Sequence, residues 1–151
     1  MKKYSKIKIA HISTVHSRTD TRIFLKEVQT LSQENNYELY LLVADGLGHE
    51  KKNNINIIDI ARKRQTNRML RMFLTSFSMF IRVLKLKPKL VHFHDPELIP
   101  IAILLKLYGI KVIYDAHEHL YKQILGKKYL PKIFRGFIAS LCFIIERFGI
   151  I

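Results

Sequence analysis

The sequence predicts an α/β domain in which helices cover both faces of an open, doubly wound, mostly parallel sheet. Short apolar stretches typical of strands alternate with longer stretches that have helical periodicity. No internal repeat or low-complexity linker interrupts this alternation. With 151 residues, 48% of them hydrophobic, the chain suits one domain spanning residues 1–151.

The first half of the chain has the pattern of a β-α-β unit followed by a third strand. Residues 6–13 (KIKIAHIS) alternate, residues 37–44 (YELYLLVA) form a nearly continuous apolar run, and residues 55–60 (INIIDI) follow, so all three predict strands. Residues 20–35 have apolar side chains at helical spacing and predict a helix with Asp20 as its N-cap. The segment GLGHEK after the second strand is interpreted as a polar loop.

Residues 66–86 predict a long helix with two apolar stripes and a basic face. One stripe comprises Phe73, Phe77, Phe80 and Leu84, and the other comprises Met72, Ser76, Met79 and Val83. The basic residues of this region are Arg64, Arg68, Arg71, Arg82 and Lys85.

The second half continues the alternation of strands and helices. Residues 90–93 predict a strand, residues 96–108 a helix that ends at Gly109 in a left-handed cap, and residues 110–115 another strand. Residues 128–149 predict a final amphipathic helix.

The net charge of +14 predicts an anionic partner, and nucleic acid, anionic lipid and phosphorylated substrate all qualify. Nine basic residues and no acidic one fall within residues 62–89. A solvated face explains such a segment equally simply, but a basic helix is also typical of proteins that bind an anionic membrane surface. No nucleic-acid-binding motif accompanies the charge, so we expect no nucleic-acid partner.

The sequence predicts a cytoplasmic protein that lies on the inner face of the cell membrane without crossing it. A single cysteine, Cys142, excludes an internal disulfide and fits a reducing compartment. The basic start is followed by a short apolar run broken by Lys8, unlike a signal peptide. The longest uncharged apolar runs are about half of what a membrane-spanning helix needs.

Three polar clusters follow predicted strand ends, at residues 13–20, 92–97 and 115–119. In doubly wound sheets ligands bind outside the carboxyl ends of the strands, so we expect these clusters to converge on one crevice. The first loop lacks the G-x-G-x-x-G fingerprint, which argues against a nicotinamide dinucleotide.

A metal site and a sugar or phosphate cleft are both open interpretations of these clusters. Metal-ligand types are present at His92, His94, Asp95, His117, Glu118 and His119. His92 lies inside a strand and His117 and His119 lack helical i, i+4 spacing, so no metal is expected and a metal-dependent hydrolase is a lesser alternative. A cleft needs only a histidine that exchanges protons and carboxylates such as Asp95 and Glu118 that orient hydroxyl groups. Asp95 also suits the N-cap of the next helix, with Pro96 at N1.

Two long segments carry a resemblance to a known family. The stretches VHSRTDTRIFLKEVQTLSQENNYELYLLVADG and VHFHDPELIPIAILLKLYGIKVIYDAHEHLYKQI, in this order, resemble the N-terminal, acceptor-side domain of family 4 retaining glycosyltransferases. The most specific part is H-x-H-D-P-E-L-x-P followed about twenty residues later by Y-D-x-H-E. The resemblance covers essentially the whole chain and implies a Rossmann-like sheet, the N-terminal half of a GT-B fold.

The resemblance also implies roles for individual residues. His117 matches the family's catalytic cleft histidine. The loop that borders the donor phosphates and the acceptor comprises Val15, His16, Ser17, Arg18, Thr19, Asp20, Thr21 and Arg22. Further candidates for substrate binding are His94, Asp95, Glu97 and Glu118.

The implied substrates are a nucleotide-sugar donor and a glycan or lipid-linked acceptor, with no other cofactor. Complete enzymes of this family have a second Rossmann-like domain that binds most of the donor. Since transfer requires donor and acceptor in one closed cleft, we expect little catalysis from residues 1–151 alone and a possible C-terminal donor-domain polypeptide as partner. The alternative is a catalytically silent remnant or a subunit that binds only a membrane or another chain.

Overall fold

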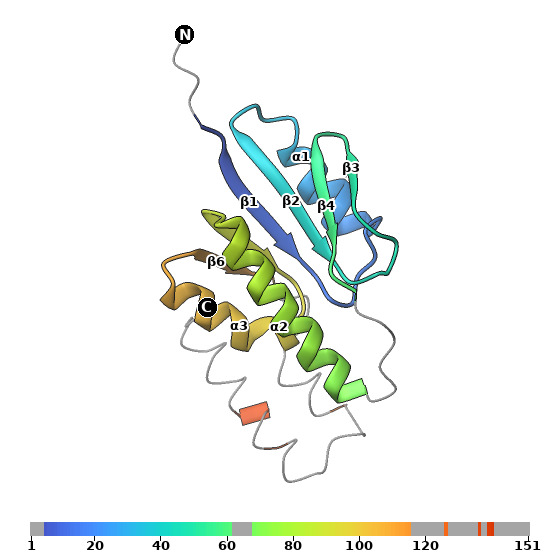
Figure 1. Ribbon diagram of the computed structural model, residues 1–151, viewed down its shortest axis with the longest axis vertical. Coiled ribbons are helices and arrows are strands. Elements are labelled where there is room, and N and C mark those ends of the chain that lie inside the picture. Colours follow the sequence, from blue (N-terminus) through green and yellow to red (C-terminus); the bar gives the residue numbers. More distant parts are fainter. Residues whose placement is uncertain (1–4, 62–67, 116–125, 127–135, 137–138, 141–151) are drawn as a thin grey trace.

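A six-stranded sheet organises the chain in the computed structural model (Figure 1). The structure describes residues 5–61, 68–115, 126, 136 and 139–140. The strand order is β3-β4-β2-β1-β5-β6, and every neighbouring pair is parallel except β3 and β4. The predicted open, mostly parallel α/β sheet is therefore confirmed.

The element bounds agree closely with the sequence pattern. The strands are β1 (Ile7–Ile12), β2 (Tyr37–Val43), β3 (Glu50–Lys52), β4 (Ile55–Asp59), β5 (Leu90–Phe93) and β6 (Lys111–Tyr114). The helical segments are η1 (Thr21–Val28), α1 (Gln29–Leu31), α2 (Arg68–Leu86), η2 (Pro96–Leu98) and α3 (Ile99–Leu107). The five predicted strands are confirmed to within one residue at each end, whereas the first helix ends at Leu31, earlier than expected.

Strand β3 corrects the prediction of a polar loop after β2. Asn53 and Asn54 have positive φ angles of 51° and 63° and join β3 to β4 in a two-residue hairpin. Asparagine adopts this conformation more easily than most residues, and turns with two positive φ angles match the twist of paired strands. The hairpin gives the sheet a short, charged, exposed edge strand.

Successive side chains of each strand point alternately to two apolar layers, one on each face of the sheet. Ala10, Ile12 and Phe93 point toward α2 and α3, whereas Ile9 and Leu39 point toward η1. Figure 1 shows α2 and α3 together on one face, with the helix of η1 and α1 behind the sheet. Gly109 ends α3 with φ at 78°, and Ile110 N–H donates to Leu105 O, which confirms the predicted cap.

Helix α2 buries one of its two predicted stripes more completely than the other. Met79 and Val83 are fully buried and Phe80 is 9% exposed, but Phe73 and Phe77 are 67% and 49% exposed. The helix therefore packs against the sheet through its Met79 side, and Phe73 and Phe77 of the other stripe are exposed to solvent.

The predicted final helix, residues 128–149, lies mostly outside the described residues, as does Cys142. Within it, Gly136, Ala139 and Ser140 are helical, and Ala139 is buried in the apolar layer beneath α2 and α3. Among the helices that the structure describes, none has both the length and the apolar character needed to cross a membrane.

We expect Leu105→Ala to lower the free energy of unfolding by about 2–5 kcal/mol, because the Leu105 side chain is fully buried between α3 and the sheet. Leu104→Ala is the matched control on the same helix, since Leu104 is 43% exposed, and it should cost about 1 kcal/mol or less. Urea titration followed by circular dichroism measures both. Equal losses for the two variants would contradict the described orientation of α3.

Candidate functional site at the carboxyl ends of the strands

The loops after β1 and β5 meet at one carboxylate. Asp95 is 3% exposed, and its Oδ2 accepts hydrogen bonds from Ser13 Oγ at 2.8 Å and from Thr14 N at 2.6 Å. Thr14 Oγ1 also donates to Glu97 Oε1 at 2.5 Å. Two of the three predicted clusters, residues 13–20 and 92–97, therefore converge as expected from the sheet rule.

The structure gives Asp95 a different structural role from the predicted cap. Its backbone does precede Pro96 at the start of η2, but no side-chain hydrogen bond caps that helix. The carboxylate instead reaches back to the end of β1, where backbone N–H groups and a hydroxyl provide its donors. Asp95 therefore stands at the predicted N-cap position with Pro96 at N1, but its side chain does not cap the helix.

The loop after β1 is the segment that the resemblance assigned to the substrates, and it divides into exposed and buried parts. Its exposed side chains are those of Val15, Ser17, Thr19, Thr21 and Arg22. His16 is half-buried, with Nδ1 at 3.3 Å from Asp20 Oδ2 and Nε2 at 3.6 Å from Asp95 Oδ1.

Arg18 is buried and turned toward the loop after β2. Its guanidinium binds Asp45 through two 2.7 Å hydrogen bonds, and Nη2 also donates to Gly48 O at 2.7 Å. Glu50 lies 3.2 Å away on the other side. The hydrogen bond from Arg18 holds the pKa of the Asp45 carboxyl below its usual value. Arg18 therefore joins the loop after β1 to the loop after β2. Only the exposed residues of the loop after β1 are accessible to a ligand.

Asp20 caps η1, as the sequence predicted. Its Oδ1 accepts from the backbone N–H groups of Ile23 and Arg22, both at 2.9 Å, and these bonds lower the pKa of Asp20. The helix that follows is of the wide π type, with Leu25 N–H directed to Asp20 O. In an ordinary α-helix, residues five apart diverge by about 140°. The wide turn brings Arg22 and Glu27 to the same side, with Nε and Oε1 3.5 Å apart.

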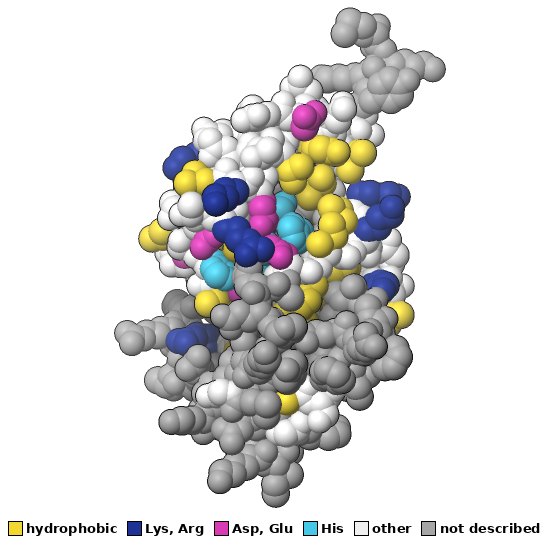
Figure 2. All heavy atoms as spheres, turned by 180° about the vertical axis from the view of Figure 1, so that it is seen from behind, with side chains coloured by type: hydrophobic (Ala, Val, Ile, Leu, Met, Phe, Trp, Pro, Cys, Tyr) yellow, Lys and Arg dark blue, Asp and Glu magenta, His cyan; other side chains and the backbone are white. Residues whose placement is uncertain are grey.

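Three histidines lie together beside η1. His11 and His92 are register partners on β1 and β5, and His94 follows on the same face, as the alternation of a strand predicts. The ring centroid of His92 lies 4.8 Å from that of His11 and 4.7 Å from that of His94. Figure 2, a view from behind, shows histidine and carboxylate side chains gathered next to basic ones on this face.

Carboxylates surround these histidines. Glu27 Oε2 lies 3.7 Å from His11 Nδ1, 3.6 Å from His92 Nδ1 and 3.3 Å from His94 Nε2. On its other side His94 faces Asp115, whose Oδ2 is 3.4 Å from His94 Nδ1 and 2.6 Å from Arg22 Nη2. Asp115, the first residue of the third predicted cluster, thus also joins the site.

Burial sets the charges in this group. It lowers the pKa of His11 to about 3, with further lowering by His92 and His94, and it also lowers the pKa of His92. Burial raises the pKa of the Glu27 carboxyl, and Asp115 raises it further. At neutral pH His11 is therefore uncharged, whereas Arg22 carries a positive charge beside Asp115 and Glu27.

His11 and Glu27 belong to the site but are not among the residues predicted from the sequence. His11 is two residues after Ile9 on β1 and so shares its face, a signal that the strand pattern contained. Glu27 gave no such signal, since its approach to Arg22 depends on the π-type turn. His117, Glu118 and His119 lie outside the described residues, and their roles stay predictions.

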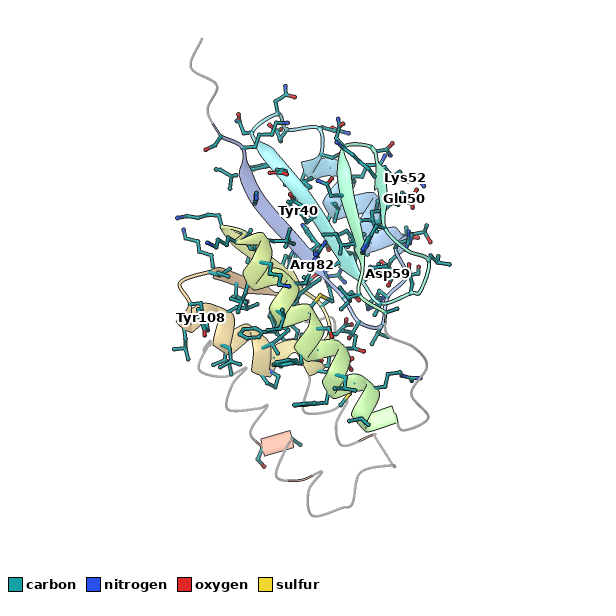
Figure 3. All side chains as sticks on the ribbon, viewed as in Figure 1. Tyr40, Glu50, Lys52, Asp59, Arg82 and Tyr108 are labelled. Atoms are coloured by element: carbon teal, nitrogen blue, oxygen red, sulfur yellow. The ribbon has the colours of Figure 1, made fainter. Side chains whose placement is uncertain are left out.

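A hollow of about 320 Å³ lies between α2 and the end of β4. It is lined by His49, Ile58, Asp59, Ile60, Phe77, Ser78, Ile81, Arg82 and Lys85. Figure 3 labels Arg82 and Asp59, which come from the two elements that border it.

Of the basic residues assigned to a membrane surface, Arg71 and Lys85 are exposed and Arg82 is half-buried. Arg64 and the Arg68 side chain lie outside the described part of the chain.

Comparison with solved structures identifies the fold. A crystal structure from Listeria monocytogenes, assigned as a UDP-N-acetylglucosamine 2-epimerase, matches 91% of this chain with a TM-score of 0.55 and 16% identity. A structure described as the glycotransferase of kitacinnamycin matches 96% with a TM-score of 0.52 and 12% identity. The chain spans only 37% and 41% of these proteins, so its fold corresponds to about half of a GT-B-like structure.

No protein-family model and no curated protein matches the sequence. The similarity to the two solved structures confirms the expected GT-B-type, Rossmann-like fold.

We expect Asp45→Asn to lower stability by about 1.5–3 kcal/mol at pH 7, because it removes the charged partner of the buried Arg18 guanidinium. The pKa of Asp45 is lowered in the folded state, so this stabilisation is fully present above the unfolded pKa near 3.8 and is lost as the pH falls further. Urea titrations at pH 7, 5 and 3 should show the difference between wild type and variant shrinking toward pH 3. A difference that stays constant would contradict the ionic role of Asp45.

Proposed function

We propose that this chain is the acceptor-side domain of a retaining glycosyltransferase that uses a nucleotide-sugar donor. The acceptor is a lipid-linked glycan or polysaccharide of the cell surface. The observation that carries the proposal is the convergence of the loops after β1 and β5 with Asp115 at the end of β6, in a sheet that corresponds to half of a GT-B-like structure.

The names of the two similar structures support a sugar substrate. One refers to UDP-N-acetylglucosamine, a nucleotide sugar, and the other refers to a glycotransferase. Their low identity supports the fold alone, so the choice of transferase rests on the sequence resemblance and on the chemistry of the crevice. His117 keeps its proposed catalytic role on the basis of the resemblance.

The described residues supply groups suited to a sugar phosphate and to hydroxyl groups. Arg22 is 49% exposed and sits between Asp115 and Glu27, so it presents a cation that is fixed in direction. Asp115 and Glu97 are partly exposed carboxylates that accept hydrogen bonds from sugar hydroxyls. Glu97 is held by Thr14, which places it at the rim of the same crevice.

Binding of sugar probes tests this site. We expect saturation-transfer NMR to show binding of at least one probe among UDP-glucose, UDP-N-acetylglucosamine, GDP-mannose and farnesyl-diphosphate-linked N-acetylglucosamine. Arg22→Ala should weaken that binding at least tenfold, because it removes the fixed cation of the crevice. Lys26→Ala, on the exposed side of the same helix, is the matched control and should bind normally.

Two results would contradict the proposal: binding of none of the four probes, or equal binding by wild type and Arg22→Ala. The first result together with vesicle binding would favour the alternative of a membrane-binding module without a sugar site.

We further propose that α2 docks this domain on an anionic membrane, where a lipid-linked acceptor resides. Phe73, Phe77 and Ile81 lie at helical spacing and are all exposed, with Arg71 and Lys85 beside them. The described part of α2 contains no acidic residue. An apolar stripe flanked by basic residues suits the boundary between lipid head groups and acyl chains. Buried Arg82 Nε, which has no hydrogen-bond partner among the described residues, offers a donor for a head-group phosphate in the adjoining hollow.

Sedimentation with vesicles tests the docking surface. We expect binding to phosphatidylglycerol vesicles, weaker binding at high salt, and little binding to phosphatidylcholine vesicles. Arg71→Gln should lower the partition coefficient about fivefold, since each surface arginine contributes about 1 kcal/mol. The double variant Phe73→Ser, Phe77→Ser should bind more weakly still, whereas Leu107→Ser, 79% exposed on α3, is the control.

Duplex DNA at the same salt concentration serves as the control for charge alone. If the protein binds DNA and phosphatidylglycerol equally well, or if Leu107→Ser weakens vesicle binding as much as the double variant, the proposal of a lipid surface on α2 is wrong.

A further inference from the structure

We propose that His11, Glu27, His92 and His94 form a tetrahedral binding site for a divalent transition metal ion of the zinc class. Each residue contributes one ligand atom, and the four atoms lie within 4.8 Å of one another. The ligands come from three elements, β1, β5 and η1. Imidazole nitrogens with one carboxylate oxygen are a donor set that zinc prefers in proteins.

The distances from Glu27 fit the edges of a coordination tetrahedron. With metal–ligand bonds of about 2.0–2.1 Å, neighbouring ligand atoms are about 3.3–3.4 Å apart. Glu27 Oε2 lies 3.3, 3.6 and 3.7 Å from the nearest nitrogens of His94, His92 and His11. The four ligand atoms lie within 4.8 Å of one another, so the widest pair must approach by up to about 1.5 Å when a metal ion binds.

These contacts are too long for ordinary hydrogen bonds, which join N and O atoms at about 2.7–3.2 Å. Within the described part of the chain, Glu27 Oε2, both ring nitrogens of His11 and Nε2 of His92 are buried without a hydrogen-bond partner. Leaving such buried groups unsatisfied destabilises the folded state. A cation at the centre of the group would satisfy Glu27 Oε2 and one ring nitrogen each of His11 and His92 at the same time.

The surroundings of the ligands also suit a metal ion. His94 directs Nε2 toward Glu27 and Nδ1 toward Asp115, the arrangement in which an outer carboxylate orients a metal-binding histidine. Arg22 contacts both Asp115 and Glu27 and balances their charge.

The protein supplies all four ligands, which is typical of a structural site. The ion would join η1 to β1 and β5 and thereby fix Arg22 beside Asp115. The inference does not depend on the proposed sugar chemistry. It departs from the expectation that no metal binds, which considered a different set of residues and lacked His11 and Glu27. The carboxylate of Asp95, a residue of that earlier set, accepts hydrogen bonds from Ser13 and Thr14.

Metal titration of the full chain, prepared without a histidine tag and stripped with a chelator, tests the site. We expect one Zn²⁺ per chain and a higher Tm with zinc. Co²⁺ in place of zinc should give the intense visible absorption of tetrahedral coordination. Both measurements use the wild-type protein, so they stand even if a buried variant fails to fold.

Variants then locate the ion. Glu27→Gln and His92→Ala should each weaken zinc binding at least tenfold, and Asp115→Asn should weaken it about 10- to 100-fold through the orientation of His94. Glu34→Gln and His49→Ala are exposed matched controls outside the group and should bind zinc normally.

Three outcomes would overturn the proposal: no stoichiometric binding, the weak spectrum of octahedral Co²⁺, or binding that survives both Glu27→Gln and His92→Ala. Because no sugar probe is present, these outcomes are independent of the test of the proposed function.

Discussion

The buried Asp95 carboxylate is the contact on which the geometry of the crevice depends. Parallel neighbouring strands leave their carboxyl ends side by side, but nothing in the ladder of β1 and β5 fixes the loops beyond those ends. Asp95 joins them, because one oxygen accepts from a hydroxyl and from backbone N–H groups of the other loop. Satisfying several donors with a single buried anion holds both loops in one position.

A second constraint is the turn at the start of η1. Asp20 caps the helix, and the wide turn then aligns Arg22 with Glu27. Arg22 reaches Asp115 after β6, and Glu27 reaches the histidines of β1 and β5. One short helical segment therefore contacts three strand ends. An ordinary α-helical turn would direct one of these two side chains elsewhere, so the local backbone form decides which groups meet.

The sequence predicted the sheet well because its signals are local. Alternation and apolar runs located five strands, Asp20 marked a helix start, and Gly109 marked a helix end. It failed at β3, whose residues Glu50–Lys52 are charged and look like a loop; the Asn53–Asn54 pair that makes the hairpin was the signal overlooked. The sheet rule also predicted where the polar loops meet. It could not predict that the Asp95 side chain accepts from the loop after β1 instead of from the first N–H groups of η2, because either set of donors would satisfy the same carboxylate.

The strand order has a consequence for how the chain assembles. β1 lies in the middle of the sheet, with β2, β4 and β3 on one side and β5 and β6 on the other. β1, β2, β4 and β3 are close in sequence, so the loops that join them close at low entropic cost. This half of the sheet can therefore form while the rest of the chain is being synthesised. The contact of Ser13 with Asp95 spans 82 residues. The half-sheet that emerges first thus offers β1 as an open edge, and the polar groups of the crevice come together only when β5 closes it.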